Sequence, residues 1–273
     1  MSHAPVPPIR LEPQEVAPET FLIRSAQPAL GAPMSVAINS VVIRGAEPVL
    51  VDTGSLANRD GWQHDVFSLV DPADVRWIFL SHDDADHTGN LALALDECPN
   101  ATLVTTWAAT ARMACEIGLP AHRLRWVHDG ESFDAGDRTL HAVRPPVYDG
   151  PATRGLFDPV TRTYWASDAF ATPMGPQAAD HVGELPAPMW SEGMAVFQHH
   201  ALCPWLAMVD GDRFAADVAR VRSMGADVVI GCHTPLITGD HVDAAFDLLA
   251  GMPGVVPPPH PDQAALEAAL AGV

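Results

Sequence analysis

The spacing of hydrophobic positions changes along this chain, and the change outlines its elements. Apolar and β-branched residues crowd segments 20–26, 34–44 and 47–54, which predicts a start rich in β-hairpins. The apolar spacing then alternates between that of strands and that of helices, which predicts a β-α-β-α passage. Its expected elements are a helix at 61–70, a strand at 75–80, a helix opening at 88–90, a strand at 101–106 and a helix at 107–117.

The second half repeats this order of strands followed by helices. Its expected strands are 136–143, 152–157, 161–170 and 226–231, and its expected helices are 190–202, 212–224, 241–250 and an Ala-rich terminal helix after Pro261. A Pro-rich loop is expected at 173–188. Two β-then-α halves predict an α/β fold, a four-layer αββα sandwich whose two sheets pack face to face under outer helices.

Prolines mark the N-terminal end of the chain. Pro5, Pro7, Pro8, Pro13 and Pro18 argue against a regular helix or a central strand, so we expect residues 1–19 to form an extended tail. Residues 20–273 are then expected to form a single domain, for which a hydrophobic content of 48% supplies a sizeable core.

The charged residues exclude several classes of function. All 15 basic residues are Arg, so Schiff-base chemistry, a phosphate-binding P-loop lysine and a Ser-Lys dyad are excluded. The 34 acidic residues give a net charge of −19, which argues against nucleic acid or an anionic membrane as the main partner. We expect a small-molecule substrate as the partner.

Cysteine usage and the N-terminal sequence predict the compartment. The four cysteines, Cys98, Cys115, Cys203 and Cys232, are scattered without paired spacing, as expected for buried or free thiols in a reducing compartment. The N-terminal stretch has no basic segment followed by an apolar run, and the chain has no apolar stretch of about 18 residues. We therefore expect a cytoplasmic protein.

Candidate metal-ligating and catalytic side chains are most concentrated in the segment His82-Asp83-Asp84-Ala85-Asp86-His87. This segment lies directly after the apolar strand expected at 75–80. Ligand sites of α/β sheets usually lie at the carboxyl ends of strands. Three carboxylates packed this tightly repel one another unless a multivalent cation neutralises them. Asp149, Asp168 and His233 end later β-branched or aromatic runs, so each is a candidate for the same cleft.

In these residues the chain resembles the metallo-β-lactamase superfamily, and more closely its di-iron branch of flavodiiron and oxygen-binding di-iron proteins. The resemblance runs from about Ala37 to about Pro235. The zinc hydrolases of the superfamily carry His at the third motif position, whereas the di-iron branch carries a carboxylate, here Asp84. The later ligand spacings also match, with 61, 18 and 64 residues between His87, Asp149, Asp168 and His233.

The resemblance implies two metal ions that share one bridging ligand, Asp168. The first ion would be held by His82, Asp84, Asp149 and Asp168, and the second by Asp86, His87, Asp168 and His233. Position 149 is Asp where the family has His, so Asp149 is either a carboxylate ligand or a turn residue in a site that has lost one ligand. Asp84 is shorter than the Glu typical of the branch.

The donor set and its neighbours complete the prediction. Three imidazoles and four carboxylates suit iron or manganese better than zinc, so iron is the first expectation, with manganese and zinc as alternatives. Asp86 is the expected catalytic residue. Asp52 is expected to orient a ligand histidine, and Thr88 to cap the helix after the motif.

Three functions remain open from the sequence. The resemblance implies binding or reduction of O2 or NO, with electrons from a separate donor protein and a head-to-tail homodimer as in related redox members. No FMN domain is expected in this chain, since the segment after His233 is too short for one. The alternatives are hydrolysis of an ester, lactam, lactone or phosphodiester by a metal-bridging hydroxide, and a non-enzymatic module.

Overall fold

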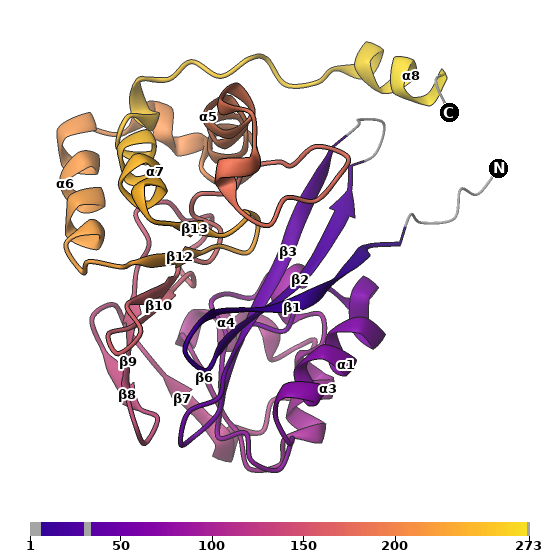
Figure 1. Ribbon diagram of the computed structural model, residues 1–273, viewed down its shortest axis with the longest axis vertical. Coiled ribbons are helices and arrows are strands. Elements are labelled where there is room, and N and C mark those ends of the chain that lie inside the picture. The colour runs from indigo at the N-terminus through magenta and orange to yellow at the C-terminus, as the bar shows by residue number, and fades with distance from the viewer. Residues whose placement is uncertain (1–6, 30–33, 272–273) are drawn as a thin grey trace.

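The computed structural model describes residues 7–29 and 34–271. Two β-sheets pack face to face, and helices cover the outer face of each sheet (Figure 1). This arrangement confirms the predicted four-layer αββα sandwich.

The first sheet holds seven strands that lie side by side in chain order. They are β1 (Ile9–Ala17), β2 (Thr20–Pro28), β3 (Ser35–Ile43), β4 (Val49–Val51), β5 (Trp77–Phe79), β6 (Thr102–Thr105) and β7 (Leu124–Trp126). Strands β1 to β4 pair antiparallel, whereas β4 to β7 pair parallel. The parallel half therefore directs several carboxyl ends toward one edge of the sheet.

The second sheet holds six strands in the order β13-β12-β11-β10-β9-β8. They are β8 (Ser132–Asp134), β9 (Thr139–Val143), β10 (Gly155–Asp158), β11 (Thr163–Trp165), β12 (Val228–Ile230) and β13 (Ile237–Thr238). Only the β11–β12 pair is parallel among these described strands. This pair brings segments far apart in sequence to the same edge.

Helices occupy both outer layers. The first layer contains α1 (Arg59–Leu69), α2 (Ala85–Thr88), α3 (Leu91–Glu97) and α4 (Trp107–Met113), and the second contains α5 (Ala187–Val196), a π-helix (Phe197–Leu202), α6 (Gly211–Arg222) and α7 (Asp240–Ala250). Short 3₁₀ turns lie at Leu56–Asn58, Ala121–Arg123, Val182–Glu184, Pro204–Met208 and Met252–Gly254. The predicted helix α8 (Gln263–Ala271) follows an extended segment and lies away from the two sheets (Figure 1).

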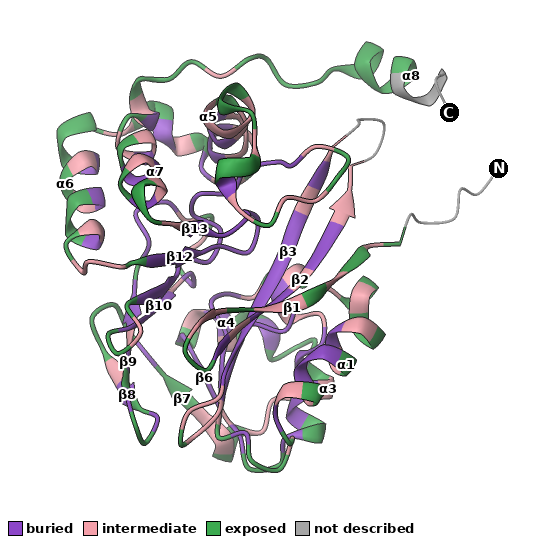
Figure 2. Cartoon of the chain, viewed as in Figure 1, coloured by how far each residue is buried: buried purple, intermediate pink, exposed green. Residues whose placement is uncertain are grey.

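Three hydrophobic clusters fill the spaces between the four layers, and Figure 2 shows the buried residues concentrated there. Phe79 and Val104 of the first sheet meet Phe133 and Trp165 of the second in the central cluster. Burial of each such side chain contributes about 1.5–3 kcal/mol, so this central layer holds the sheets together. Among the described residues, every helix is too short or too polar to cross a membrane.

The N-terminal segment corrects one expectation. Residues 9–17 of the predicted tail form β1, which pairs with β2 at the edge of the first sheet. Pro13 is accommodated because β1 is an edge strand and its pairing register shifts between Leu11 and Gln14. Residues 1–6 of the same prediction lie outside the described residues.

Candidate metal centre

The candidate residues gather where the parallel strands of the two sheets end. Asp52 follows β4, His82 follows β5, Asp168 follows β11 and His233 follows β12. Because β4 pairs in parallel with β5, and β11 with β12, the four carboxyl ends point the same way within their sheets. The seven sequence-predicted ligands are brought together at this edge.

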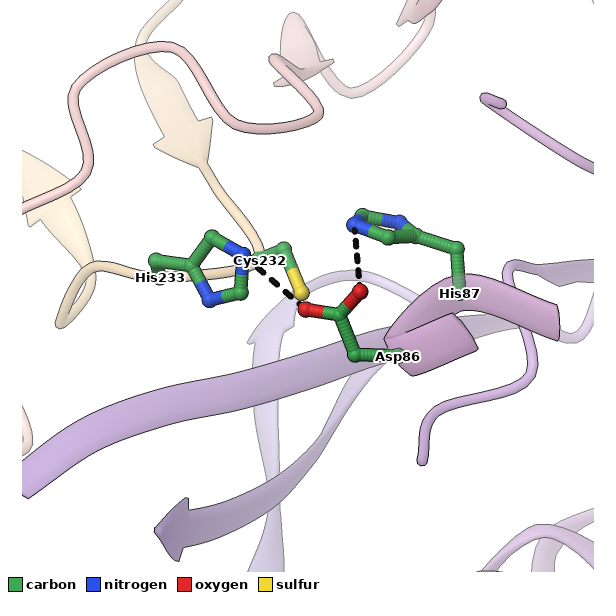
Figure 3. A group of neighbouring side chains, drawn as sticks. All are labelled: Asp86, His87, Cys232 and His233. Atoms are coloured by element: carbon green, nitrogen blue, oxygen red, sulfur yellow. Dashed lines mark ion pairs between the residues drawn. The ribbon is translucent and has the colours of Figure 1, made fainter. Parts of the chain in front are cut away.

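The motif after β5 folds into a loop followed by the single-turn helix α2. Asp84 precedes α2 with an extended backbone, and Asp86 and His87 lie on the turn itself, where Figure 3 shows both side chains near His233. Asp83 lies apart from this group and pairs with Arg112 of α4 at 2.6 Å. The carboxylates of the motif are thus divided between the site and a neighbouring arginine.

The first group of side chains surrounds His82. Its Nε2 lies 3.2 Å from Asp168 Oδ2, 3.5 Å from Asp149 Oδ2 and 3.7 Å from Asp84 Oδ2. His82 and Asp168 are buried, whereas 48% of the Asp84 side chain is exposed. Asp149, the least certain member in the sequence, does therefore face the same point as its neighbours.

The second group lies on the other side of Asp168. Asp168 Oδ1 is 3.0 Å from His87 Nε2 and 3.4 Å from His233 Nε2. Asp86 Oδ2 lies 3.2 Å from His233 Nε2, and Asp86 Oδ1 lies 3.9 Å from His87 Nε2. The two oxygens of Asp168 therefore face different groups, as a carboxylate between two ions would.

The residues present fit metal ions. Among the described residues, His82 Nε2, His87 Nε2 and Asp168 Oδ1 are buried atoms without a hydrogen-bond partner, which is costly for polar atoms. Two ligand atoms bound at about 2.1 Å to one ion lie roughly 3.0–3.4 Å apart. The imidazole-to-Asp168 distances fall in this range, so ions would satisfy these atoms.

The other nitrogen of each imidazole is used by the protein. His87 Nδ1 lies 2.8 Å from Asp52 Oδ2, and His233 Nδ1 donates to the carbonyl oxygen of Ala37 at 2.9 Å. His82 Nδ1 lies 3.1 Å and 3.2 Å from the hydroxyls of Ser81 and Ser167. These contacts hold each ring so that its Nε2 is directed into the site.

Two of the supporting residues adopt left-handed backbone conformations. Asp52 has φ of 55° and Ser167 has φ of 54°, although neither is a glycine. Such conformations cost energy and persist where the surrounding structure requires them. Here they occur at the ends of β4 and β11, where the chain turns to present its side chains to the site.

The electrostatics of the centre favour bound cations. Burial and His87 lower the pKa of His82, but Asp168 and Asp84 outweigh them and raise it to about 10. Burial alone would raise the pKa of Asp168, but the three imidazoles hold it well below its usual range. Burial, Asp168 and Asp84 raise the pKa of Asp149 against the opposing effect of His82. Protons, or metal ions that displace them, would neutralise the negative charge of these clustered carboxylates.

The structure also corrects the role predicted for Thr88. Thr88 belongs to α2, its hydroxyl donates to the carbonyl oxygen of Asp84, and Asn90 is the residue that precedes α3. The prediction that Thr88 caps the following helix is therefore wrong, because α2 and α3 are separate helices.

The structure also places Cys232 among the candidate ligands, which the sequence analysis did not predict. Its only signal in the sequence was its position beside His233.

Comparisons with known proteins agree with this fold. The sequence model described as "ODP family beta lactamase" matches residues 36–211, more than half of the chain. A curated relative, the anaerobic nitric oxide reductase flavorubredoxin of Vibrio vulnificus, is 25% identical over 133 residues, which are 48% of this chain and 27% of that protein. The chain spans less than half the length of the curated relatives that it matches.

Two solved structures share the fold at low sequence identity. The rubredoxin oxygen:oxidoreductase of Desulfovibrio gigas is 14% identical, with a TM-score of 0.73 over 88% of this chain and 61% of that one. The flavodiiron protein of Giardia intestinalis is 15% identical, with a TM-score of 0.72 over 89% of this chain and 59% of that one. At these identities the likeness concerns the fold.

Proposed function

The chain belongs to the ODP family of beta lactamases, and on that premise we propose that it holds two metal ions, iron by preference, and binds or reduces O2 or NO. The observation that carries the proposal is the pair of ligand groups joined by the two oxygens of Asp168. The names of the relatives, an oxygen oxidoreductase and a nitric oxide reductase, support this choice of small molecule.

Each group of side chains would hold one ion. His82, Asp84 and Asp149 would hold the first, Asp86, His87 and His233 the second, and Asp168 would bind both. The three imidazoles and four carboxylates are oxygen-rich, which favours iron or manganese over zinc. When bound there, ferrous ions would supply electrons to a small diatomic molecule.

The chain's own residues fix and shield this centre. Asp52 orients His87, the hydroxyls of Ser81 and Ser167 orient His82, and the buried imidazoles keep bulk water away from their side of the site. Asp86 is more open, with 32% of its side chain exposed. It is the catalytic residue we propose, because its carboxylate reaches His233 in the second ligand group and is still open to solvent.

The proposal also includes an electron donor protein and a homodimeric state. Reduction requires electrons from outside the ligand set, so we propose a separate donor protein as the redox partner. A homodimer is also proposed, since an adjoining subunit could bring that donor toward the centre. A small diatomic substrate leaves no need for nucleic acid or a membrane as partner, which agrees with the net charge of −19.

The test combines metal content with gas consumption. Protein purified without added metal should contain two ions per chain, mainly iron, and after anaerobic reduction should consume O2 or NO with an optical change. Asp168→Asn should lose both, whereas Asp158→Asn, a buried carboxylate paired with Arg138 elsewhere in the second sheet, should lose neither. Two zinc ions, no optical change with O2, and hydrolysis of a chromogenic lactam, lactone or bis-phosphoester would support the hydrolytic alternative instead.

A further inference from the structure

A thiol lies among the side chains of the second ligand group. Asp86, His87, Cys232 and His233 each offer one donor atom, and these four atoms all lie within 4.8 Å of one another. Figure 3 shows the sulfur of Cys232 beside the carboxylate of Asp86, with the two imidazoles on either side. Atoms bound to one ion at 2.0–2.3 Å lie at most about 4.6 Å apart, so small movements would bring all four to a single ion.

The cysteine comes from the same strand end as a predicted ligand. Cys232 and His233 follow β12 after one intervening residue, Gly231. The backbone N–H of Cys232 donates to the carbonyl oxygen of Ser167 at 2.7 Å, next to Asp168. Its carbonyl oxygen accepts from Asn39 at 3.0 Å, so its backbone is fixed from both sheets. This backbone therefore fixes the point from which the sulfur reaches His87 and His233.

A second observation points to a ligand at this position. His87 Nε2 and Asp168 Oδ1 are fully buried atoms without a hydrogen-bond partner among the described residues, and they lie 3.0 Å apart beside the second group. Cys232 is also fully buried. The side chain of Cys232 borders the central hydrophobic cluster, but its sulfur also lies within reach of two imidazoles and a carboxylate, which packing alone does not require.

We propose that Cys232 is a metal ligand and binds, as a thiolate, the ion held by Asp86, His87 and His233. This proposal rests on the proposed two-metal function. When the sulfur–metal bond forms, the Sγ–H proton leaves to solvent, and the imidazoles bind in their neutral form. The donor atoms of the second ion then become two nitrogens, carboxylate oxygen and one sulfur.

The consequence is that the two ions occupy chemically different sites. The first group, His82, Asp84 and Asp149, offers one nitrogen and carboxylate oxygens, which suit hard ions. The thiolate gives the second group a preference for thiophilic ions such as Zn²⁺, Co²⁺ or Cd²⁺. Both sites should bind iron when iron is supplied, and an added thiophilic ion should displace iron more readily from the second site than from the first.

The test follows the sulfur directly. Metal-free protein is titrated anaerobically with Co²⁺, and a sulfur-to-cobalt charge-transfer band in the near ultraviolet is recorded with the number of ions bound. The band should appear in the unaltered chain and saturate at one cobalt per chain. Cys98→Ala is the matched control, because Cys98 is equally buried but lies in the cluster under α3, and it should retain the band.

Variants at position 232 separate ligand loss from misfolding. Cys232→Ala should lose the band and bind the second ion at least about 10–100-fold more weakly, which is the loss when only a residue that supports a ligand is removed. Cys232→Ser should lose the band but keep more of the affinity, since an oxygen replaces the sulfur. The cadmium-113 resonance of the unaltered chain reports sulfur ligation without any variant.

The outcomes distinguish this proposal from the proposed function. Two cobalt ions bound by the unaltered chain with no band, or a band that persists in Cys232→Ala, would overturn the role of Cys232 and leave the two-metal site standing. Failure of the unaltered chain to bind cobalt, iron or zinc would overturn the proposed function, and this inference with it.

Discussion

The role of Asp52 shows how a residue outside the ligand set can control it. Asp52 lies 2.8 Å from His87 Nδ1 and accepts hydrogen bonds from the backbone N–H and the hydroxyl of Ser81, each at 2.6 Å. Asp52→Asn keeps the shape but removes the charge that supports the imidazole. We expect one ion to bind roughly 10–100-fold more weakly, measured by competition with a chromogenic chelator.

The control for Asp52 is Asp158, another buried carboxylate, which pairs with Arg138. Asp158→Asn should lower stability but leave metal affinity unchanged. Equal metal affinities for Asp52→Asn and the unaltered chain would show that Asp52 does not orient His87.

Asp149 can be tested by stoichiometry. Its Oδ2 lies 3.5 Å from His82 Nε2, and its hydroxyl donor Thr153 holds the other oxygen at 2.9 Å. Asp149→Ala should reduce the bound metal from two ions per chain to about one, because the first ion loses a ligand. Asp149→His should restore two ions, and Asp96→Ala, at an exposed position of α3, should change nothing. Two ions in Asp149→Ala would make Asp149 a turn residue.

Individual residues of the site differed in how far the sequence could predict them. His82, Asp84, Asp86 and His87 lie in one short motif, so their proximity follows from the chain itself. Asp168 and His233 required a spacing match, because strand pairing brings them to each other and the packing of the two sheets brings them to the motif. Cys232 could not be distinguished from a packed thiol, since the direction of a side chain after a strand depends on how the loop turns.

At the scale of elements, α2 is held to the loop after β4 by close backbone contact. Gly89 N donates to the carbonyl oxygen of Gly54 at 2.9 Å, and a Cβ on Gly89 would lie 2.1 Å from the backbone nitrogen of Leu56. Gly89→Ala should therefore push α2 away and destabilise the fold by about 1–3 kcal/mol. Weaker metal binding should accompany the loss, because α2 carries Asp86 and His87.

Gly118→Ala is the matched control for this prediction, since a Cβ there meets no atom of the described structure within 4 Å. Denaturant unfolding and metal titration of both variants provide the measurements. If both alanine variants behave alike, the contact between α2 and the β4 loop is not tight.

The elements that the sequence missed are short or lie at sheet edges. Strands β7 and β8 have three residues each and β13 has two, which is too few for a period-2 pattern to emerge. The prolines of β1 argued only against a central strand, so the segment was expected to be an extended tail, and the edge strand that it forms was not predicted. Longer segments such as β3 and α6 were predicted correctly, because β3 is apolar and buried along nearly its whole length and α6 buries Phe214, Val218 and Val221 at helical spacing.

At the scale of the whole molecule, the centre links metal binding to the response of the fold to pH. In the metal-free protein the pKa of His82 is raised from 6.5 to about 10, and those of His87 and His233 are also raised. A raised histidine pKa adds stability that is complete below pH 6.5 and is lost as the pH rises through about 10. The melting temperature of chelator-treated protein should therefore fall across this window.

The stabilisation that bound metal gives the protein should change with pH in the opposite sense over the same range. Each ion displaces protons from the imidazoles, so metal affinity rises as those protons become easier to remove. The increase in melting temperature caused by metal should thus grow between about pH 6.5 and 10. Thermal melts with and without chelator measure it, and His82→Gln should flatten the metal-free curve. Parallel curves for the two forms of the unaltered chain would contradict the link, because they would mean that ions and protons do not compete for the same imidazoles.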